Sequence, residues 1–202
     1  MPQEKLWTRP FITLLLLSVM TSAAYTMVNP TLSAYCQSLG ATSTQAGMII
    51  GIMSLTALVI RPFAGAASDR CNRKRIMFVA TVFLSLSVLG YAFARSLPAL
   101  IAFRVAHGEA FAVSGTTTLA FASSLVPEKR LGEGVGYLGL GNVLSTALGP
   151  NLGLMICDRF GYAACYQVSA LLAGIAAVGM LTVPYLFQPQ PRRSLALRDL
   201  FA

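Results

Sequence analysis

Ionisable side chains inside strongly apolar stretches are the residues of this sequence whose types and spacing suggest chemistry. Arg104, His107 and Glu109 lie close together in a stretch that is otherwise mostly apolar. Within a helix that crosses a membrane, a charged side chain costs about 2.5–3.5 kcal/mol on insertion scales. Such a residue therefore faces a cavity or a partner, or its long side chain extends to the membrane surface. The residues alone do not decide which of these two locations the Arg104 side chain has.

The spacing of these three residues divides them between two faces of a helix. His107 follows Arg104 by three residues and lies near the same face. Glu109 follows Arg104 by five residues, about 140° around the helix, and faces another helix. Histidine titrates near neutrality, and a partly buried glutamate also exchanges protons in that range. Either residue is a candidate proton site, and a hydrogen-bonded structural histidine is the alternative.

Four further polar residues interrupt apolar stretches. Tyr25 and Asn29 are four residues apart and share one helix face, and Asn29-Pro30 predicts a local break in that helix. Asn142 lies in a later apolar stretch, and Asn151 has a similar setting. Contact with a small-molecule substrate and hydrogen bonding between helices both account for such residues.

The elements that must position these side chains are membrane helices. Apolar residues make up 55% of the 202 residues and charged residues only 11%, against about 25% charged residues in a soluble domain. Each apolar block approaches or exceeds the roughly 20 residues that cross a bilayer, and no alternating pattern of a barrel occurs. We expect an all-α membrane protein with a six-helix bundle over 1–187, its helices at about 11–34, 45–67, 76–95, 98–124, 135–157 and 163–187.

The first block has an alternative interpretation. Lys5 and Arg9 precede the run LLLLSVM, and the small residues TSAA follow it, as in a cleavable signal peptide. However, the apolar run continues to Val28, which favours a spanning helix.

Lysine and arginine are distributed unevenly between the segments that join the blocks. The N-terminus and the segments 67–75, 127–133 and 188–202 contain eleven of the 15, whereas the opposite segments contain only Arg95 and Arg159. The basic side of a membrane protein is cytoplasmic. We therefore expect a multi-pass protein of the plasma (inner) membrane with both termini in the cytoplasm and with 188–202 as a tail or connector.

The same distribution argues against other partners and cofactors. The basic residues are spread over four short segments without interleaved aromatic residues, so we expect no nucleic-acid binding. The four cysteines and the single histidine show no ligand spacing, so we expect no metal and no cofactor. A bridge between Cys157 and Cys165 is conceivable, but small packing residues are the preferred interpretation.

Prolines and glycines that match at a fixed offset suggest an internal repeat. At an offset of 88 residues, Pro62 aligns with Pro150 and Gly65 with Gly153. A repeat of three helices places the second copy upside down in the membrane, and inverted three-helix repeats are typical of secondary transporters. We expect two inverted three-helix repeats with a site between them.

The segment 61–75 joins the second and third blocks with a dense set of charges. Pro62 and Gly65 are expected to bend the end of the second helix, and Gly65 to allow close helix approach. Asn72 tolerates a left-handed turn. A purely topogenic basic turn is the alternative, but it leaves Asp69 unexplained.

This segment resembles a signature of the major facilitator superfamily, G-x-x-x-D-R/K-x-G-R-R. The matching positions are Gly65, Asp69, Arg70, Arg73 and Lys74, with Asn72 in place of the second glycine and Lys74 in place of the last arginine.

Two further motifs carry the same resemblance. Arg104-Val-Ala-His107-Gly108 resembles the family element R-x-x-Q-G, with histidine in place of glutamine. The residues Gly136, Gly149, Pro150 and Gly153 fit the antiporter signature G-x8-G-x3-G-P-x2-G-G, with Ser145 and Leu154 in place of two glycines.

The resemblance implies a proton-coupled secondary transporter, an efflux antiporter that works by alternating access. It implies that Arg104 faces the cavity, where it takes part in proton coupling or anchors substrate. It also implies that segment 65–74 is a conformational switch and that Gly149, Pro150 and Gly153 bend a helix. The chain resembles one half of such a transporter, so a second six-helix half or self-association is expected. The alternatives are a non-transporting or inactive half and an uptake symporter. An intramembrane enzyme is disfavoured because no hydrolase motif occurs.

Overall fold

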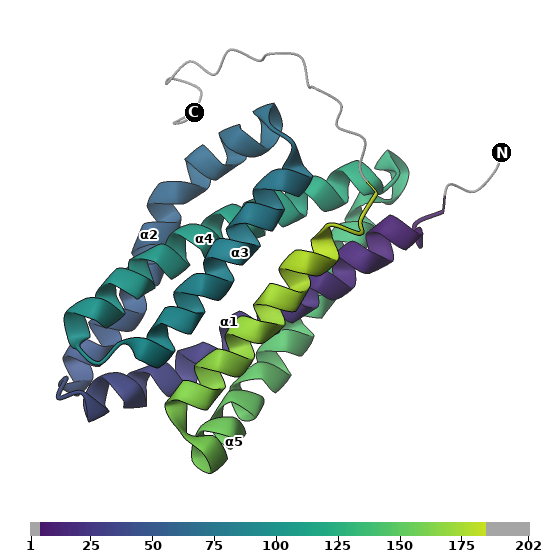
Figure 1. The fold of residues 1–202 in the computed structure, drawn as a ribbon. Helices are drawn as coiled ribbons and strands as arrows, with labels where there is room; N and C mark the ends of the chain where they lie inside the picture. Colours follow the sequence, from purple (N-terminus) through teal and green to yellow (C-terminus); the bar gives the residue numbers. More distant parts are fainter. Residues whose placement is uncertain (1–4, 185–202) are drawn as a thin grey trace.

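Long helices account for the residues that the structure describes. The computed structural model describes residues 5–184, and no strand occurs among them. In chain order the elements are α1 (Arg9–Ser38), α2 (Ser43–Arg70), α3 (Arg73–Phe93), α4 (Leu97–Leu125), the short 3₁₀ helix η1 (Glu128–Arg130) and α5 (Leu131–Met180). The helices run lengthwise along the bundle (Figure 1). The last expected block ends beyond the described residues, and the expected tail 188–202 lies outside them.

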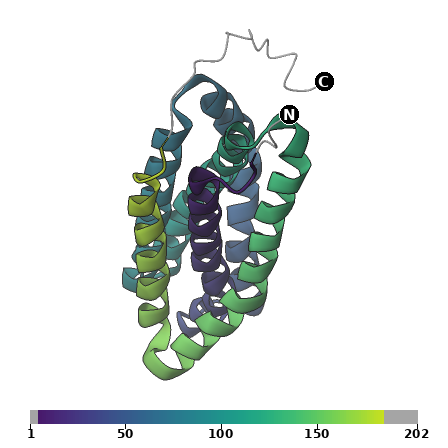
Figure 2. The ribbon, with the colours of Figure 1, turned by 90° about the vertical axis from the view of Figure 1, so that its right-hand side faces the viewer.

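Helix α5 consists of two legs that meet at Gly161. This residue has φ 83° and ψ 169°, which are not helical angles. The chain reverses direction there, and the second leg returns along the bundle (Figures 1 and 2). Glycine adopts a positive φ without steric cost, so one residue makes the turn. The segment 158–162, between the fifth and sixth expected helices, is helical as far as Phe160.

Among residues 5–184, four stretches are long and apolar enough to cross a membrane, namely α1, α2, α3 and Glu128–Met180. Helix α4 is not among them. It carries Arg104, His107 and Glu109 together with several serines and threonines, and these polar groups lower its hydropathy. The helix that is not apolar enough by this criterion is thus also the one with Arg104 and His107 buried inside the bundle.

The packing of the helices does not follow chain order. Helix α1 packs mainly against α5, α2 against α4, and α3 against both α4 and α5. Helices α2 and α3 are joined by a short turn, yet they have few contacts with each other, and they stand apart in Figure 1. Two buried apolar clusters close the bundle, one around Tyr91 and Tyr166 and one around Phe11 and Phe121.

Side-chain caps define the starts of α1, α2 and α3. Thr42 and Gln45 form a reciprocal capping box at α2, and Thr8 caps α1. Asn72 caps α3, because its side-chain oxygen accepts a hydrogen bond of 3.2 Å from the backbone N–H of Arg75. The left-handed turn expected at Asn72 is wrong, since its φ is −65°. Asparagine at an N-cap satisfies a free backbone donor of the helix.

Two expected effects of proline and glycine are also absent. Helix α1 continues through Asn29-Pro30 to Ser38, so the break expected there does not occur. The packing of a long apolar helix against its neighbours maintains the helix across the one hydrogen bond that proline removes. No atom lies within 4 Å of a Cβ built on Gly65, so this glycine does not mediate close helix contact.

Candidate functional site

Arg104 is the centre of a buried polar cluster. Its side chain is only 1% exposed. Nη2 donates to the side-chain oxygen of Asn29 on α1 (3.0 Å) and to the carbonyl of Ile50 on α2 (3.1 Å), and Nε donates to the same carbonyl (3.3 Å). The guanidinium therefore connects three helices and does not reach the surface.

The charge of Arg104 is balanced by dipoles rather than by a carboxylate. Both ion pairs found within residues 5–184, Arg73–Asp69 and Arg130–Glu133, lie elsewhere. Nη1 of Arg104 has no hydrogen-bond partner among the described residues. A buried charge is stable only with good partners, and Nη1 is a buried donor that these dipoles leave unsatisfied.

His107 lies next to Arg104 on the inner face of α4. Its ring is fully buried, and Nδ1 forms a hydrogen bond of 3.1 Å with the hydroxyl of Tyr91 on α3. Nε2 has no partner within the described part of the chain. Tyr25 of α1 packs edge-on against the His107 ring and stacks on Phe111, with centroid distances of 5.9 and 4.6 Å.

A cavity of about 620 Å³ adjoins this cluster. Tyr25 and Phe111 form the boundary between the cluster and the cavity. Hydroxyl groups predominate among its polar side chains, and they come from α1, α4 and α5: Ser18, Thr21, Ser22, Thr26, Ser114, Thr116, Thr118 and Thr146. Asn142 also lines the cavity and accepts a hydrogen bond of 2.7 Å from Ser22.

Arg61 is a cavity residue that the sequence analysis did not single out as a site residue. It lies on α2 and lines the same cavity, whose lining within the described part of the chain includes no acidic residue. The signal that identified Arg104, a cation inside an apolar block, applies equally to Arg61. Tyr91 was also missed, because a tyrosine in an apolar helix is not distinguishable from core without knowing its neighbours.

The predicted site residues thus fall into three places. Asn29, Arg104 and His107 form the buried cluster, and they are not among the residues that line the 620 Å³ cavity. Tyr25 and Asn142 line that cavity. Glu109 lies in a separate cavity between α2 and α3. Asn151 donates to the carbonyl of Ala147 in its own helix (3.3 Å).

Small residues of α5 allow α1 to pack closely. A Cβ on Gly153 would collide with the carbonyl oxygen of Met27, and one on Gly149 would collide with Thr26. Thr26 donates to the carbonyl of Ser145 (2.9 Å). Pro150 lies inside the helix. Gly136, by contrast, has no atom within 4 Å of a built Cβ, so it has no such packing role.

The segment 65–74 combines bracing contacts with an exposed acid. Arg73 donates to the carbonyls of Ser68 (3.1 Å) and Ala120 (2.8 Å), and thereby joins α2, α3 and α4. Lys74 donates to the carbonyls of Leu181 and Val183, both at 2.7 Å. Asp69 has a side chain that is 65% exposed and forms an ion pair of 3.6 Å with Arg73. Arg70 is exposed as well.

Comparison with known proteins identifies the family. The family model of the Major Facilitator Superfamily matches residues 14–198. The uncharacterized MFS-type transporter YuxJ of Bacillus subtilis is 32% identical over 158 residues, which cover 75% of this chain and 40% of YuxJ. The multi-drug resistance efflux pump PmrA of Streptococcus pneumoniae is 28% identical over 190 residues, which cover 90% of this chain and 47% of the pump.

Solved structures show the same fold. The crystal structure of the human organic anion transporter MFSD10 superimposes with a TM-score of 0.78 at 19% identity, covering 95% of this chain and 52% of that protein. The chain spans about half the length, or less, of the relatives that it matches. From the motifs, the buried polar cluster and these matches together, the chain belongs to the major facilitator superfamily.

Proposed function

We propose that this chain is one half of a secondary transporter that exports small molecules by alternating access, coupled to protons. In this proposal both termini are cytoplasmic, and six helices cross the inner membrane as two inverted three-helix repeats. The legs of α5 on either side of Gly161 are the fifth and sixth of these helices. Efflux is favoured over uptake because multidrug efflux pumps are among the relatives.

The pattern of helix contacts supports the inverted repeats. If the two repeats are related by a two-fold axis, α1 is equivalent to α4, and α2 is equivalent to the first leg of α5. The contact between α2 and α4 is then equivalent to the contact between α5 and α1, and the structure has both contacts. Helix α3 and the second leg of α5 are then equivalent, and they meet where Ser85 donates to the carbonyl of Ala170 (2.7 Å).

The single observation that carries the proposal is the hydroxyl-lined cavity beside the buried Arg104 cluster. Binding sites for small molecules combine apolar walls with a few polar groups that fix orientation, and an ionisable residue inside a membrane domain marks a functional site by default. A purely anchoring bundle has no need of a buried cation with a free donor.

In this proposal His107 carries the coupling proton. Its Nε2 is free within the described residues, and its Nδ1 is held by Tyr91. Tyr25 lines the cavity and packs against the His107 ring. A substrate in the cavity would therefore contact Tyr25, and through Tyr25 it would act on His107. Glu109 does not belong to this site, because it lines the other cavity.

The opposite wall of the cavity is supplied by further helices, on the same polypeptide or on another. The face that would meet them is apolar and exposed, and includes Leu55, Leu58, Leu140, Val143 and Leu144. Asp69 is exposed in the last turn of α2 and is proposed to engage a helix end of the other half in one conformation. Arg73 and Lys74 fix the turn that presents Asp69.

The proposal is tested by proton-driven export of ethidium in everted membrane vesicles that contain the chain with a complementary six-helix half. We expect Asn142→Ala and Ser22→Ala to lower export severalfold, because they remove a polar pair from the cavity. Asn151→Ala, which alters an asparagine bonded only within its helix, is the matched control. Equal export by Asn142→Ala and the unsubstituted assembly would contradict the assignment of the cavity.

A further inference from the structure

Two cysteines lie on either side of the turn in α5. Gly161 makes this turn, and Cys157 and Cys165 are each four residues from it, one on each leg. Because the two legs meet at Gly161 (Figures 1 and 2), positions equally distant from it face each other near the turn. The two thiol groups are close enough to interact with each other, and the side chain of Thr31 on α1 interacts with both.

The two thiols differ in how accessible they are. Neither is part of a disulfide in the structure. Cys157 is partly exposed, and the residues that follow it, Asp158 and Arg159, are exposed as well, whereas Cys165 is fully buried. A reagent in solution therefore reaches Cys157 first, and Cys165 is placed to react with whatever Cys157 has bound. The sequence alone favoured small packing residues here, but the contact between the thiols favours a bridge.

We propose that Cys157 and Cys165 are a redox-active pair that closes a disulfide across the turn of α5. The oxidant is itself a disulfide, on a small molecule or on a protein. The Cys157 thiolate attacks one sulfur of this oxidant and forms a mixed disulfide, and the other half of the oxidant leaves as a thiol. The Cys165 thiolate then attacks the Cys157 sulfur and expels the second half. Two cysteine thiols are thus oxidised, the oxidant is reduced to two thiols, and these take up the two protons.

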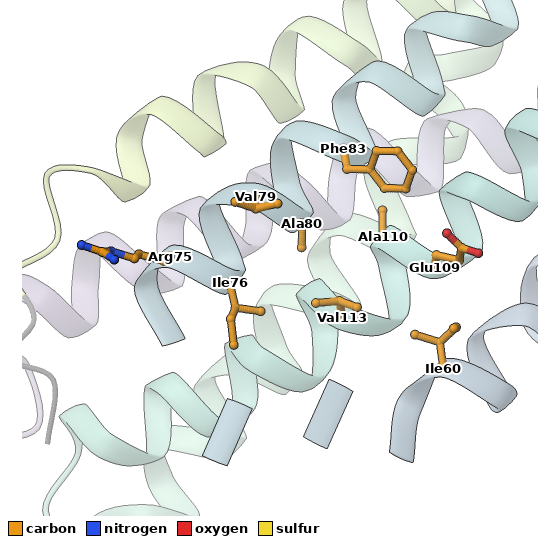
Figure 3. A pocket seen from close by; sticks show the side chains of 9 residues that line it. All are labelled: Ile60, Arg75, Ile76, Val79, Ala80, Phe83, Glu109, Ala110 and Val113. Atoms are coloured by element: carbon orange, nitrogen blue, oxygen red, sulfur yellow. The ribbon is translucent and has the colours of Figure 1, made fainter. Parts of the chain in front are cut away.

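The disulfide would hold the two legs of α5 together at one end. Gly161 has a positive φ, and no atom lies within 4 Å of a Cβ built on it, so neighbouring side chains do not hold the turn in place. A bond between the legs restricts changes in the angle between them. Neither cysteine lines the hydroxyl-lined cavity or the apolar cavity that contains Glu109 (Figure 3), so oxidation leaves the walls of both cavities chemically unaltered.

The pairing of these thiols does not depend on the proposed export function, because it concerns a contact within this chain. Only the supply of oxidant depends on the proposed orientation, which places the turn on the outer side of the membrane, where disulfides persist.

The test is oxidation of the purified full chain by oxidised glutathione in phosphatidylcholine nanodiscs. The chain carries Cys71→Ser, which removes an exposed thiol. The oxidised protein is denatured, alkylated with N-ethylmaleimide and digested with trypsin. Trypsin cleaves after Arg159, between the two cysteines, so mass spectrometry detects the bridge as two linked peptides that dithiothreitol separates. We expect most chains to give this linked pair, and the buried Cys36 to be recovered as an alkylated thiol.

A matched control moves one thiol by a single position. In the double variant Ala164→Cys, Cys165→Ala the thiol stays close to the turn but is rotated by about 100° around the second leg. We expect at least tenfold less linked peptide from this variant, because the thiols no longer face each other. Equal linkage in both chains would overturn the proposal, since random motion of the turn would then account for it. Absence of linkage between Cys157 and Cys165 would overturn it as well.

Discussion

The side-chain amide of Asn29 on α1 accepts a hydrogen bond of 3.0 Å from the guanidinium of Arg104 on α4. This contact joins the first helix of each proposed repeat, and the same nitrogen of Arg104 also donates to the carbonyl of Ile50 on α2. One cation thus fixes the relative positions of three helices around the polar cluster. The geometry depends on a planar group with several donors, which lysine does not provide.

Arg104→Lys is therefore expected to impair proton-linked export more than membrane insertion. The charge is retained, but the hydrogen bonds to Asn29 and Ile50 cannot all be replaced by one ammonium. A hydrogen bond to a charged group contributes about 1.5–3 kcal/mol, so we expect export to fall about tenfold or more in a complete assembly. Arg95→Lys, at an exposed position, is the control. Export by Arg104→Lys at the level of this control would remove Arg104 from the mechanism.

Gly153→Ala is expected to destabilise the bundle. The added Cβ would meet the main-chain carbonyl of Met27, and because backbone cannot rotate away, α1 and α5 must separate. Overpacking of this kind costs about 1–3 kcal/mol, which lowers the midpoint of thermal unfolding in detergent. Gly136→Ala is a matched control in the same helix with open space around it. A midpoint for Gly153→Ala no lower than that of Gly136→Ala would show that the α1–α5 contact is not close.

Asp69→Asn is expected to leave stability unchanged and to reduce transport in a complete assembly. The ion pair of Asp69 with Arg73 is exposed, and exposed pairs contribute about 0–1 kcal/mol. Arg73→Leu removes the bonds to Ser68 and Ala120 and should lower the unfolding midpoint instead. Transport by Asp69→Asn at the level of the unsubstituted protein would show that the segment 65–74 is only a topogenic turn.

The proposed orientation predicts which residues react with a membrane-impermeant maleimide in intact cells. Cys71 is exposed in the turn between α2 and α3, which the basic residues assign to the cytoplasm, so it should not react. Ser38→Cys, exposed at the end of α1, should react. Cys71 and Ser38→Cys are tested in a chain in which Cys36, Cys157 and Cys165 are replaced by serine. Labelling of Cys71 without labelling of Ser38→Cys would invert the topology.

The sequence predicted the helical class and identified residues that the structure brings together. Arg104, His107 and Asn29 stood out because polar groups inside apolar stretches are costly and need partners, and the structure supplies those partners from other helices. These features depend on residue type and on spacing within one helix, which sequence reports directly.

Features that depend on neighbouring helices were not predictable. Gly65 and Gly153 align in the internal repeat, yet only Gly153 meets another helix. Glu109 and His107 are two residues apart, yet Glu109 lines a cavity where α2 and α3 separate on one side of α4, whereas His107 is fully buried in the polar cluster. Tyr91 became a site residue only through its contact with His107. Tertiary packing decides each of these cases.

The central claim is that this chain forms one wall of a transport pathway that further helices complete. It is tested most directly by ethidium flux into proteoliposomes under an imposed pH gradient, with the chain reconstituted either as a verified monomer or together with a complementary six-helix half. The account predicts no gradient-driven flux from the monomer and a flux from the completed assembly that Asn142→Ala reduces. Gradient-driven flux from the verified monomer would contradict it.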